Sequence, residues 1–152
     1  MKKMNKWFTV FILVMFVGSA FAFAFMYTPD VSSQQQYENV IYRPLTNYED
    51  AYFLQKNIVI IKYFYSDDCP DCGYFESQVA DLLEFFGTQI FVQAIDADAY
   101  ANETQSLGIE SIPTLYLKGN SIDKVSEKIP TDDMITKVCL LYFSYVPQCN
   151  VF

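Results

Sequence analysis

Hydrophobic positions beyond residue 40 follow two periods, which together predict alternating strands and helices. Residues 58–65 are almost continuously apolar, and this predicts a central strand buried on both faces, as in a sheet covered by helices. Further along, apolar side chains recur at helical spacing, at Phe75, Val79, Leu82, Leu83 and Phe86. Gly87 is a suitable residue for the end of this helix. A stripe of this kind is typical of a helix face that packs into a core.

Capping and turn residues predict the elements at the start of the domain. Residues 40–42 predict a short first strand, which Pro44 restricts to a sheet edge. Thr46 and Glu49 match a capping box, so we expect a helix that runs from there to Lys56.

The second half of the chain continues the alternation. Residues 90–95 predict a strand, and residues 96–107 predict a loop with a short helix. Residues 114–118 and 122–127 flank Gly119-Asn120 and predict a hairpin. Thr131 opens a last helix, whose first turn carries carboxylates that suit the helix dipole. The predicted order is therefore β-α-β-α-β-β-α.

The first 27 residues predict a membrane or export segment. Lys2, Lys3 and Lys6 precede residues 7–27, a stretch without charge that is long enough for a transmembrane helix. The lysines would stay in the cytoplasm and the rest of the chain would lie outside it. Residues 28–39 are polar and predict a linker, followed by a domain over residues 40–152.

A cleaved signal peptide is the alternative for the same segment. Residues 7–17 would be its apolar core, and Ala20-Phe21-Ala22 or Ala22-Phe23-Ala24 would be its cleavage site. Both interpretations export residues 28–152. The location of the domain outside the cytoplasm therefore does not depend on the choice between an uncleaved anchor and secretion.

Composition and charge narrow the function. A hydrophobic content of 52% with 18% aromatic residues excludes a disordered chain. All 18 acidic residues follow residue 27, whereas three of the ten basic residues precede it, so the exported part has a net charge of 7 − 18 = −11. This charge argues against nucleic acid as a partner. The absence of histidine excludes Cys–His catalysis and a histidine-ligated metal.

Candidate chemistry follows directly after the central strand, in Cys69-Pro70-Asp71-Cys72. Strand, Cys-x-x-Cys and helix in that order would place Cys69 at a helix N-terminus, where the dipole and unpaired N–H groups favour a thiolate. Pro70 would occupy the first helical position. Cys72, one turn deeper, would lie near enough to attack a mixed disulfide on Cys69. No metal or other cofactor is predicted.

These residues, together with Ile112-Pro113-Thr114 about 40 residues later, resemble the thioredoxin family. The resemblance covers roughly residues 40–144. It implies an α/β thioredoxin-like fold with a central mixed sheet flanked by helices, here preceded by an N-terminal hydrophobic helix. It also implies a cis-proline at Pro113 beside the sulfurs, and pairing of the Ile112 backbone with an extended substrate.

The chain departs from common thioredoxins at several positions. Asp67-Asp68 stands where many members have an acidic residue and then tryptophan, and Tyr63 stands where many have a buried aspartate. A glycine expected after the fifth strand is not evident near residues 128–130. These differences argue against equating the chain with a general cytosolic thioredoxin.

Cys139, in the last helix, and Cys149 have several interpretations. A structural disulfide is favoured by the even cysteine count and by the feasible loop between them. A second redox pair, free thiols and a four-cysteine zinc site are the alternatives, although the Cys-x9-Cys spacing is wide for zinc.

The sequence therefore predicts an extracytoplasmic thiol–disulfide oxidoreductase that acts on disulfide-containing or dithiol proteins, with a membrane redox partner. A non-catalytic thioredoxin-fold module that binds or scaffolds partners is the alternative. Asp68 and Asp71, with Asp67, surround Cys69 and disfavour its thiolate, which indicates a reductant or mild exchanger. Pro70 favours the oxidising direction by analogy with oxidising relatives.

Overall fold

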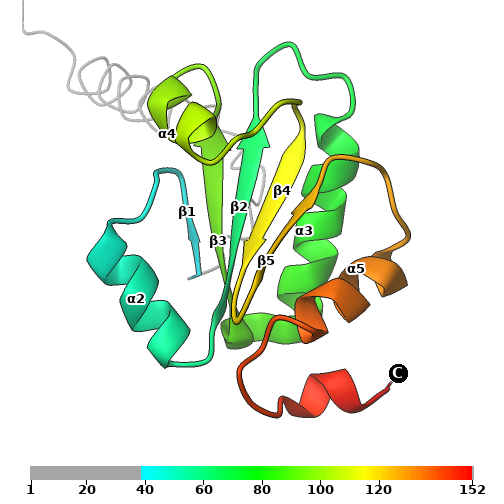
Figure 1. The fold of residues 1–152 in the computed structure, drawn as a ribbon. Coiled ribbons are helices and arrows are strands. Elements are labelled where there is room, and N and C mark those ends of the chain that lie inside the picture. The colour runs from blue at the N-terminus through cyan, green and yellow to red at the C-terminus, as the bar shows by residue number, and fades with distance from the viewer. Residues whose placement is uncertain (1–38, 152) are drawn as a thin grey trace, which may run out of the picture. The chain divides into compact units, whose positions relative to one another are not determined.

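The apolar run predicted as the central strand forms β2 (Val59–Tyr65), the middle strand of a five-stranded mixed sheet. The computed structural model describes residues 39–151, and the sheet order within them is β1-β3-β2-β4-β5 (Figure 1). β2 pairs in parallel with β3 and antiparallel with β4. The other elements are β1 (Val40–Ile41), α2 (Asn47–Gln55), α3 (Cys72–Phe86), η1 (Gly87–Gln89), β3 (Ile90–Asp96), α4 (Ala101–Ser106), β4 (Thr114–Lys118), β5 (Ile122–Val125), α5 (Thr131–Cys139) and η2 (Pro147–Val151). The predicted strands and helices are present in the predicted order, with one addition: the short helix expected within residues 96–107 forms α4, between β3 and β4.

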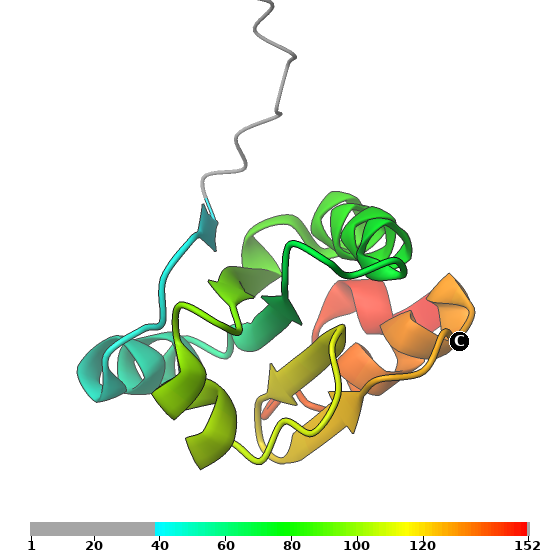
Figure 2. The ribbon, with the colours of Figure 1, turned by 90° about the horizontal axis from the view of Figure 1, so that it is seen from above.

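Helices cover the sheet on both faces, as the burial of β2 requires. Figure 2 shows α3 and α5 on one side of the sheet and α2 and α4 on the other. The face toward α3 and α5 is apolar and forms the larger core cluster, in which Phe75, Leu82 and Phe86 of α3 and Met134 of α5 are almost fully buried. Each such side chain contributes about 1.5–3 kcal/mol relative to an exposed one. This cluster is the main source of stability.

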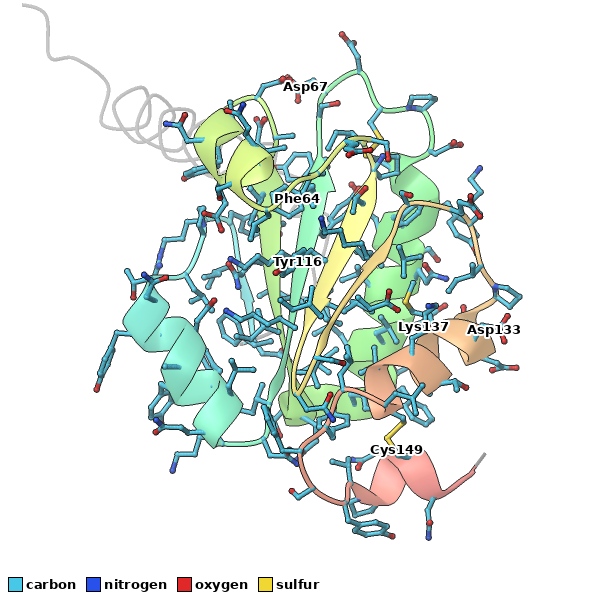
Figure 3. All side chains as sticks on the ribbon, viewed as in Figure 1. Phe64, Asp67, Tyr116, Asp133, Lys137 and Cys149 are labelled. Carbon is cyan, nitrogen blue, oxygen red and sulfur yellow. A yellow bond between two sulfur atoms is a disulfide. The ribbon has the colours of Figure 1, made fainter. Side chains whose placement is uncertain are left out.

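The opposite face carries charge among its buried residues. Lys62 of β2 is buried and forms an ion pair of 2.7 Å with Glu103 of α4. Lys118 of β4 forms another, also of 2.7 Å, with the buried Asp50 of α2. Each helix of this layer is therefore held to the sheet by one lysine–carboxylate pair, beside a small cluster of buried residues, Phe64, Ile95 and Tyr116 (Figure 3).

The predicted capping box starts α2. The Thr46 side chain accepts a hydrogen bond from the Glu49 backbone at 3.3 Å, and the Thr46 backbone donates to the Glu49 side chain at 2.8 Å. Arg43 adds two hydrogen bonds to the same carboxylate, at 2.7 and 3.1 Å. The bonds from Arg43 and then from Thr46 lower the pKa of Glu49 to about 2. The acidic residue thus stays charged where it caps the helix.

The C-terminal tail packs at the start of β2. The Asn57 side chain accepts hydrogen bonds from the backbones of Phe143 and Ser144, at 2.8 and 3.2 Å. The backbone of Asn120 donates to the Leu141 carbonyl at 2.8 Å. Gly119 lies where the hairpin turn meets the tail. A Cβ at this position would lie 2.1 Å from the Leu141 carbonyl oxygen. The hairpin turn and the tail can approach this closely only with glycine.

Cys139 and Cys149 form a disulfide that closes this tail onto α5, with a Cα–Cα distance of 5.5 Å. Figure 3 shows Cys149 at the opposite end of the domain from Asp67, which lies in the loop after β2.

Within residues 39–151, no helix has the length and apolar character needed to cross a membrane. The predicted hydrophobic helix at residues 7–27 lies outside the described residues.

We expect the tail disulfide to stabilise the fold and to leave the dithiol chemistry intact. Changing both Cys139 and Cys149 to Ser should cost about 2–3 kcal/mol of unfolding free energy, because it frees a loop of ten residues in the unfolded chain. Thermal unfolding should then shift down by on the order of 10 °C. Loss of disulfide exchange in a folded double variant would instead indicate a redox role for this pair.

Candidate active site

The cysteine pair lies in the loop that follows the C-terminal end of β2. Cys69 and Cys72 form a disulfide with an S–S distance of 2.12 Å and a Cα–Cα distance of 5.4 Å. The backbone N–H of Cys72 donates to the carbonyl of Cys69 at 3.3 Å, so the four-residue motif is a tight turn. The turn therefore lies at the end of the sheet where the buried strand β2 finishes.

The helix after the motif begins later than the sequence predicts. α3 starts at Cys72 with Asp71 as its N-cap, so the prediction that Pro70 occupies the first helical position is wrong. Residues 69–72 instead form a turn, closed by the hydrogen bond from the Cys72 N–H to the Cys69 carbonyl three residues earlier. Cys69 still lies next to the start of the helix, on its positive side.

The two cysteines differ in exposure. Cys72 is 7% exposed and belongs to the core cluster beneath α3. Cys69 is half-buried and packs on the same cluster. Asp68, Pro70 and Asp71 around it are exposed. A substrate sulfur therefore has easier access to Cys69, whereas Cys72 lies behind it.

A cis peptide bond joins Ile112 and Pro113. Thr114, the next residue, pairs with Phe64 of β2, so Pro113 lies at the same end of the sheet as the cysteine loop. Pro113 is buried, and Ile112 is half-buried against the cluster that contains Cys72. The Thr114 hydroxyl donates to the Ser111 carbonyl at 2.6 Å and holds this loop. The structure thus brings Ile112 and Pro113 to the dithiol end.

Tyr63 lies beneath the motif. Its side chain is 4% exposed, and its hydroxyl donates to the carbonyl of Cys72 at 3.2 Å. Burial, with a smaller effect of the Glu76 and Tyr65 charges, raises the pKa of Tyr63 well above its ordinary value. This phenol keeps its proton at neutral pH.

The loop before α5 adds residues that the sequence does not predict for the site. Lys128 forms an ion pair of 2.7 Å with Asp71 and lies 5.5 Å from the ring centre of Tyr74. The Ile129 carbonyl accepts hydrogen bonds from the Tyr74 hydroxyl and, at 2.6 Å, from the Gln78 amide. Residues 128 and 129 are therefore fastened to the first turns of α3.

This ion pair changes the electrostatics inferred from the sequence. Asp67, Asp68 and Asp71 have no basic residue within six positions of Cys69, which predicts an uncompensated negative charge. The fold brings Lys128, in the loop between β5 and α5, to Asp71 at the start of α3. One of the three carboxylates is thus paired, and both partners are about half exposed, so water screens the pair.

Cys139 and Cys149 lie away from the dithiol, at the C-terminal end of the chain (Figure 3). All four cysteines are paired in disulfides in this structure, and the Cys139–Cys149 pair agrees with the structural interpretation. Tyr142, beside the tail, donates to the carbonyl of Gln89 beyond the end of α3. Cys72 begins that 15-residue helix, which is about 22 Å long. The tail therefore packs near the opposite end of α3 from the Cys69–Cys72 disulfide.

Comparison with known proteins agrees with this geometry. The sequence profile of the Thioredoxin family matches residues 40–139. The chain belongs to the thioredoxin family. It is 24% identical over 85 residues to Thioredoxin 2 of Plasmodium falciparum (isolate 3D7). That match covers 55% of this chain and 54% of the relative, so the chain spans about half the length of the curated relative it matches.

Solved structures show the same thioredoxin fold. A single-residue mutant of thioredoxin from Halobacterium salinarum NRC-1 is 25% identical, with a TM-score of 0.57 over 72% of this chain and 95% of its own. Chloroplastic thioredoxin z is 15% identical, with a TM-score of 0.54 over 66% and 93%. A thioredoxin-2 described as a component of malaria parasite protein secretion machinery is 22% identical, with a TM-score of 0.51 over 66% and 90%.

We expect Asp71 and Lys128 to have opposite effects on the ionisation of Cys69. Lys128→Met leaves the Asp71 charge uncompensated and should raise the pKa of Cys69 in the reduced protein. Asp71→Asn leaves the lysine uncompensated and should lower it by a similar amount. The double variant should return close to the wild-type value. The pH dependence of Cys69 alkylation measures each pKa.

Lys56→Met is the matched control, because Lys56 lies at the C-terminal cap of α2, away from the dithiol. Asp68→Asn should lower the pKa of Cys69 as well. Identical titration curves for Lys128→Met and Lys56→Met would show that the ion pair does not influence the nucleophile.

Proposed function

We propose that the protein is an extracytoplasmic thiol–disulfide oxidoreductase in which Cys69 is the nucleophile and Cys72 the resolving cysteine. The observation that carries the proposal is the Cys69–Cys72 disulfide at the end of β2, at the same sheet end as the cis Ile112–Pro113 bond. The match to the thioredoxin family supports the same activity.

The reaction follows from the unequal exposure of the two sulfurs. In the reducing direction, the Cys69 thiolate attacks a substrate disulfide, and one substrate sulfur leaves as a thiolate that takes a proton from water. Cys72 then loses its proton and attacks the Cys69 sulfur, which releases the second substrate sulfur. Two electrons pass to the substrate and the Cys69–Cys72 disulfide forms. The oxidising direction reverses these steps.

Proteins with disulfides or dithiols in extended segments are the proposed substrates. Ile112 is half-buried against the cluster that contains Cys72, and its backbone is the proposed partner of such a segment. Pro113 is buried and directly precedes Thr114, the first residue of β4. A membrane protein that supplies or accepts the electrons is the proposed redox partner.

The exposed carboxylates favour a reductant or mild exchanger. Asp67 and Asp68 are exposed near Cys69, and negative charge there disfavours the thiolate that a strong oxidant needs. Lys128 offsets part of this effect through its pair with Asp71. The proposal therefore places the protein nearer to the reducing end than to the strongly oxidising end.

Residues 1–27 are proposed to export the domain, with an uncleaved membrane anchor as the first choice and a cleaved signal peptide as the second. The basic start at Lys2, Lys3 and Lys6 and the uncharged residues 7–27 support this. The Cys139–Cys149 disulfide supports it independently, because structural disulfides persist in oxidising compartments. Residues 28–39 would then link the segment to the domain.

A non-catalytic binding module on the same fold is the alternative function. It would not need a half-buried cysteine joined to a second cysteine at the dithiol end, so the observed pair favours catalysis. Reduction of insulin disulfides by the reduced protein distinguishes the two functions. No turnover above that of the Cys69→Ser variant would favour the binding module.

We expect the two cysteines to differ in a trapping experiment. Cys72→Ser should accumulate mixed disulfides on Cys69, because the more accessible cysteine, the nucleophile, remains and the resolving thiol is absent. Cys69→Ser should accumulate none, because Cys72 is 7% exposed. Mass spectrometry of the trapped adducts measures both. Equal trapping by the two variants would contradict the assignment.

The redox poise provides a separate prediction. Equilibration of the full chain with glutathione buffers should give a reduction potential for Cys69–Cys72 well below about −120 mV, the strongly oxidising end of the known range. Asp67→Asn and Asp68→Asn should each raise the potential slightly, because they stabilise the reduced thiolate. A wild-type potential near −120 mV would rule out the reductant interpretation.

The location is tested by fractionation of cells that express the full chain. Protease added to intact spheroplasts or sealed vesicles of known orientation should digest residues 40–152 from the outer side. An anchor leaves the domain in the membrane fraction after alkaline carbonate extraction, whereas cleavage yields a soluble chain whose sequence begins after Ala22 or Ala24. Protection of the domain from protease on the outer side would contradict export.

A further inference from the structure

Tyr63 connects the central strand to the first residue of α3. Its side chain belongs to the core cluster on the α3 face of the sheet, together with Cys72 and Phe75. Its ring lies 5.6 Å from that of Tyr65, centre to centre. The hydroxyl is buried and donates to the Cys72 carbonyl at 3.2 Å. A buried phenol needs a hydrogen-bond partner, and here that partner is the backbone of the proposed resolving cysteine.

We propose that Tyr63 is a positioning residue for the resolving step, and that its hydroxyl holds the backbone of Cys72 where the Cys72 sulfur can reach Cys69. The inference rests on the proposed function and adds a residue to it.

The need for such a residue arises in the mixed-disulfide intermediate. In the oxidised protein, the Cys69–Cys72 bond itself fixes the two Cα atoms 5.4 Å apart. Once Cys69 is bonded to a substrate sulfur, the Cys69–Cys72 disulfide is absent and no longer holds the Cys72 sulfur close to Cys69. Its sulfur must nevertheless lie in line with the Cys69–substrate bond, which breaks as the new Cys69–Cys72 bond forms and the substrate sulfur leaves. The Tyr63 hydrogen bond and the packing of Cys72 keep this geometry.

Tyr63 acts by position and not by proton transfer. Burial keeps the phenol protonated by raising its pKa, so it is a donor and does not serve as a base near neutral pH. Two titratable groups act on it. One is Glu76 of α3, which is exposed, and the other is Tyr65, its neighbour on β2. Among the described residues, the one buried carboxylate is Asp50, which is paired with Lys118 in the α2 layer on the other face of the sheet. The core around Cys72 thus holds no carboxylate that could share this task.

Tyr142 provides a matched control. It is also a buried tyrosine whose hydroxyl donates to one main-chain carbonyl, that of Gln89, at 3.1 Å. Burial raises its pKa in the same direction. It lies beyond the far end of α3, away from Cys72. Tyr63→Phe and Tyr142→Phe therefore each remove one buried hydroxyl and keep the ring, but only the first touches the dithiol.

The test follows the two sulfur reactions separately in the full chain, with Cys139 and Cys149 kept as a disulfide. Reduced protein is mixed with an aromatic disulfide, Ellman's reagent, in stopped flow. Attack by Cys69 releases one coloured thiolate at a rate that depends on reagent concentration. Attack by Cys72 on the resulting mixed disulfide releases the second at a rate that does not.

Tyr63→Phe should slow the second phase about three- to tenfold, the factor that corresponds to one net hydrogen bond, and leave the first phase unchanged. Tyr142→Phe should leave both phases unchanged, although both variants should melt at lower temperature. Equal second phases in the two variants would overturn the role of Tyr63, as would loss of the fold in Tyr63→Phe alone. If the wild-type protein shows no second phase, the proposed function fails instead.

Discussion

The burial of β2 between two layers of helices is the constraint on which the rest of the structure depends. Six of its seven residues are buried, and its neighbours on both sides are strands, so its backbone and side chains have little freedom. The cysteine turn begins where this strand ends. The pairing of Phe64 with Thr114 brings the cis bond at Pro113 to the same edge. A rigid strand thus anchors the loop that carries the half-buried Cys69.

At that end of the sheet, two side chains from different parts of the chain contact the cysteine turn. Tyr63 approaches from the strand below, and Lys128 from the loop before α5. One is a buried hydrogen bond that water does not weaken, whereas the other is a half-exposed ion pair worth about 0–1 kcal/mol. The buried contact is therefore suited to hold geometry. The exposed one is suited to adjust charge near Cys69, and its effect should decrease with added salt.

Local patterns in the sequence predict most of the fold. The continuous apolar run at residues 58–65, the stripe through Phe75 and Leu82 and the capping box at Thr46 depend on near neighbours, and the structure contains all three. The start of α3 differs from the prediction because Pro70 is equally compatible with a turn, and a hydrogen bond between the two cysteines decides the matter. The role of Lys128 cannot be predicted from the sequence, because Lys128 and Asp71 are far apart along the chain. They come together only when the strands between them are arranged in the sheet. Tyr63 stands out in the sequence as a departure from the family, but the pattern does not reveal its partner.

The unequal composition of the two helical layers has a consequence for local opening of the fold. α3 and α5 are held by a large apolar cluster, whereas α2 and α4 depend on the lysine–carboxylate pairs of Lys118 and Lys62 and on fewer buried side chains. Layers with less buried apolar contact open at lower free energy. Amide hydrogens of α2 and α4 should therefore exchange with solvent before those of α3. The layer that contains Cys72 should therefore unfold last. α2 and α4 can then open while Cys69 and Cys72 keep their relative positions.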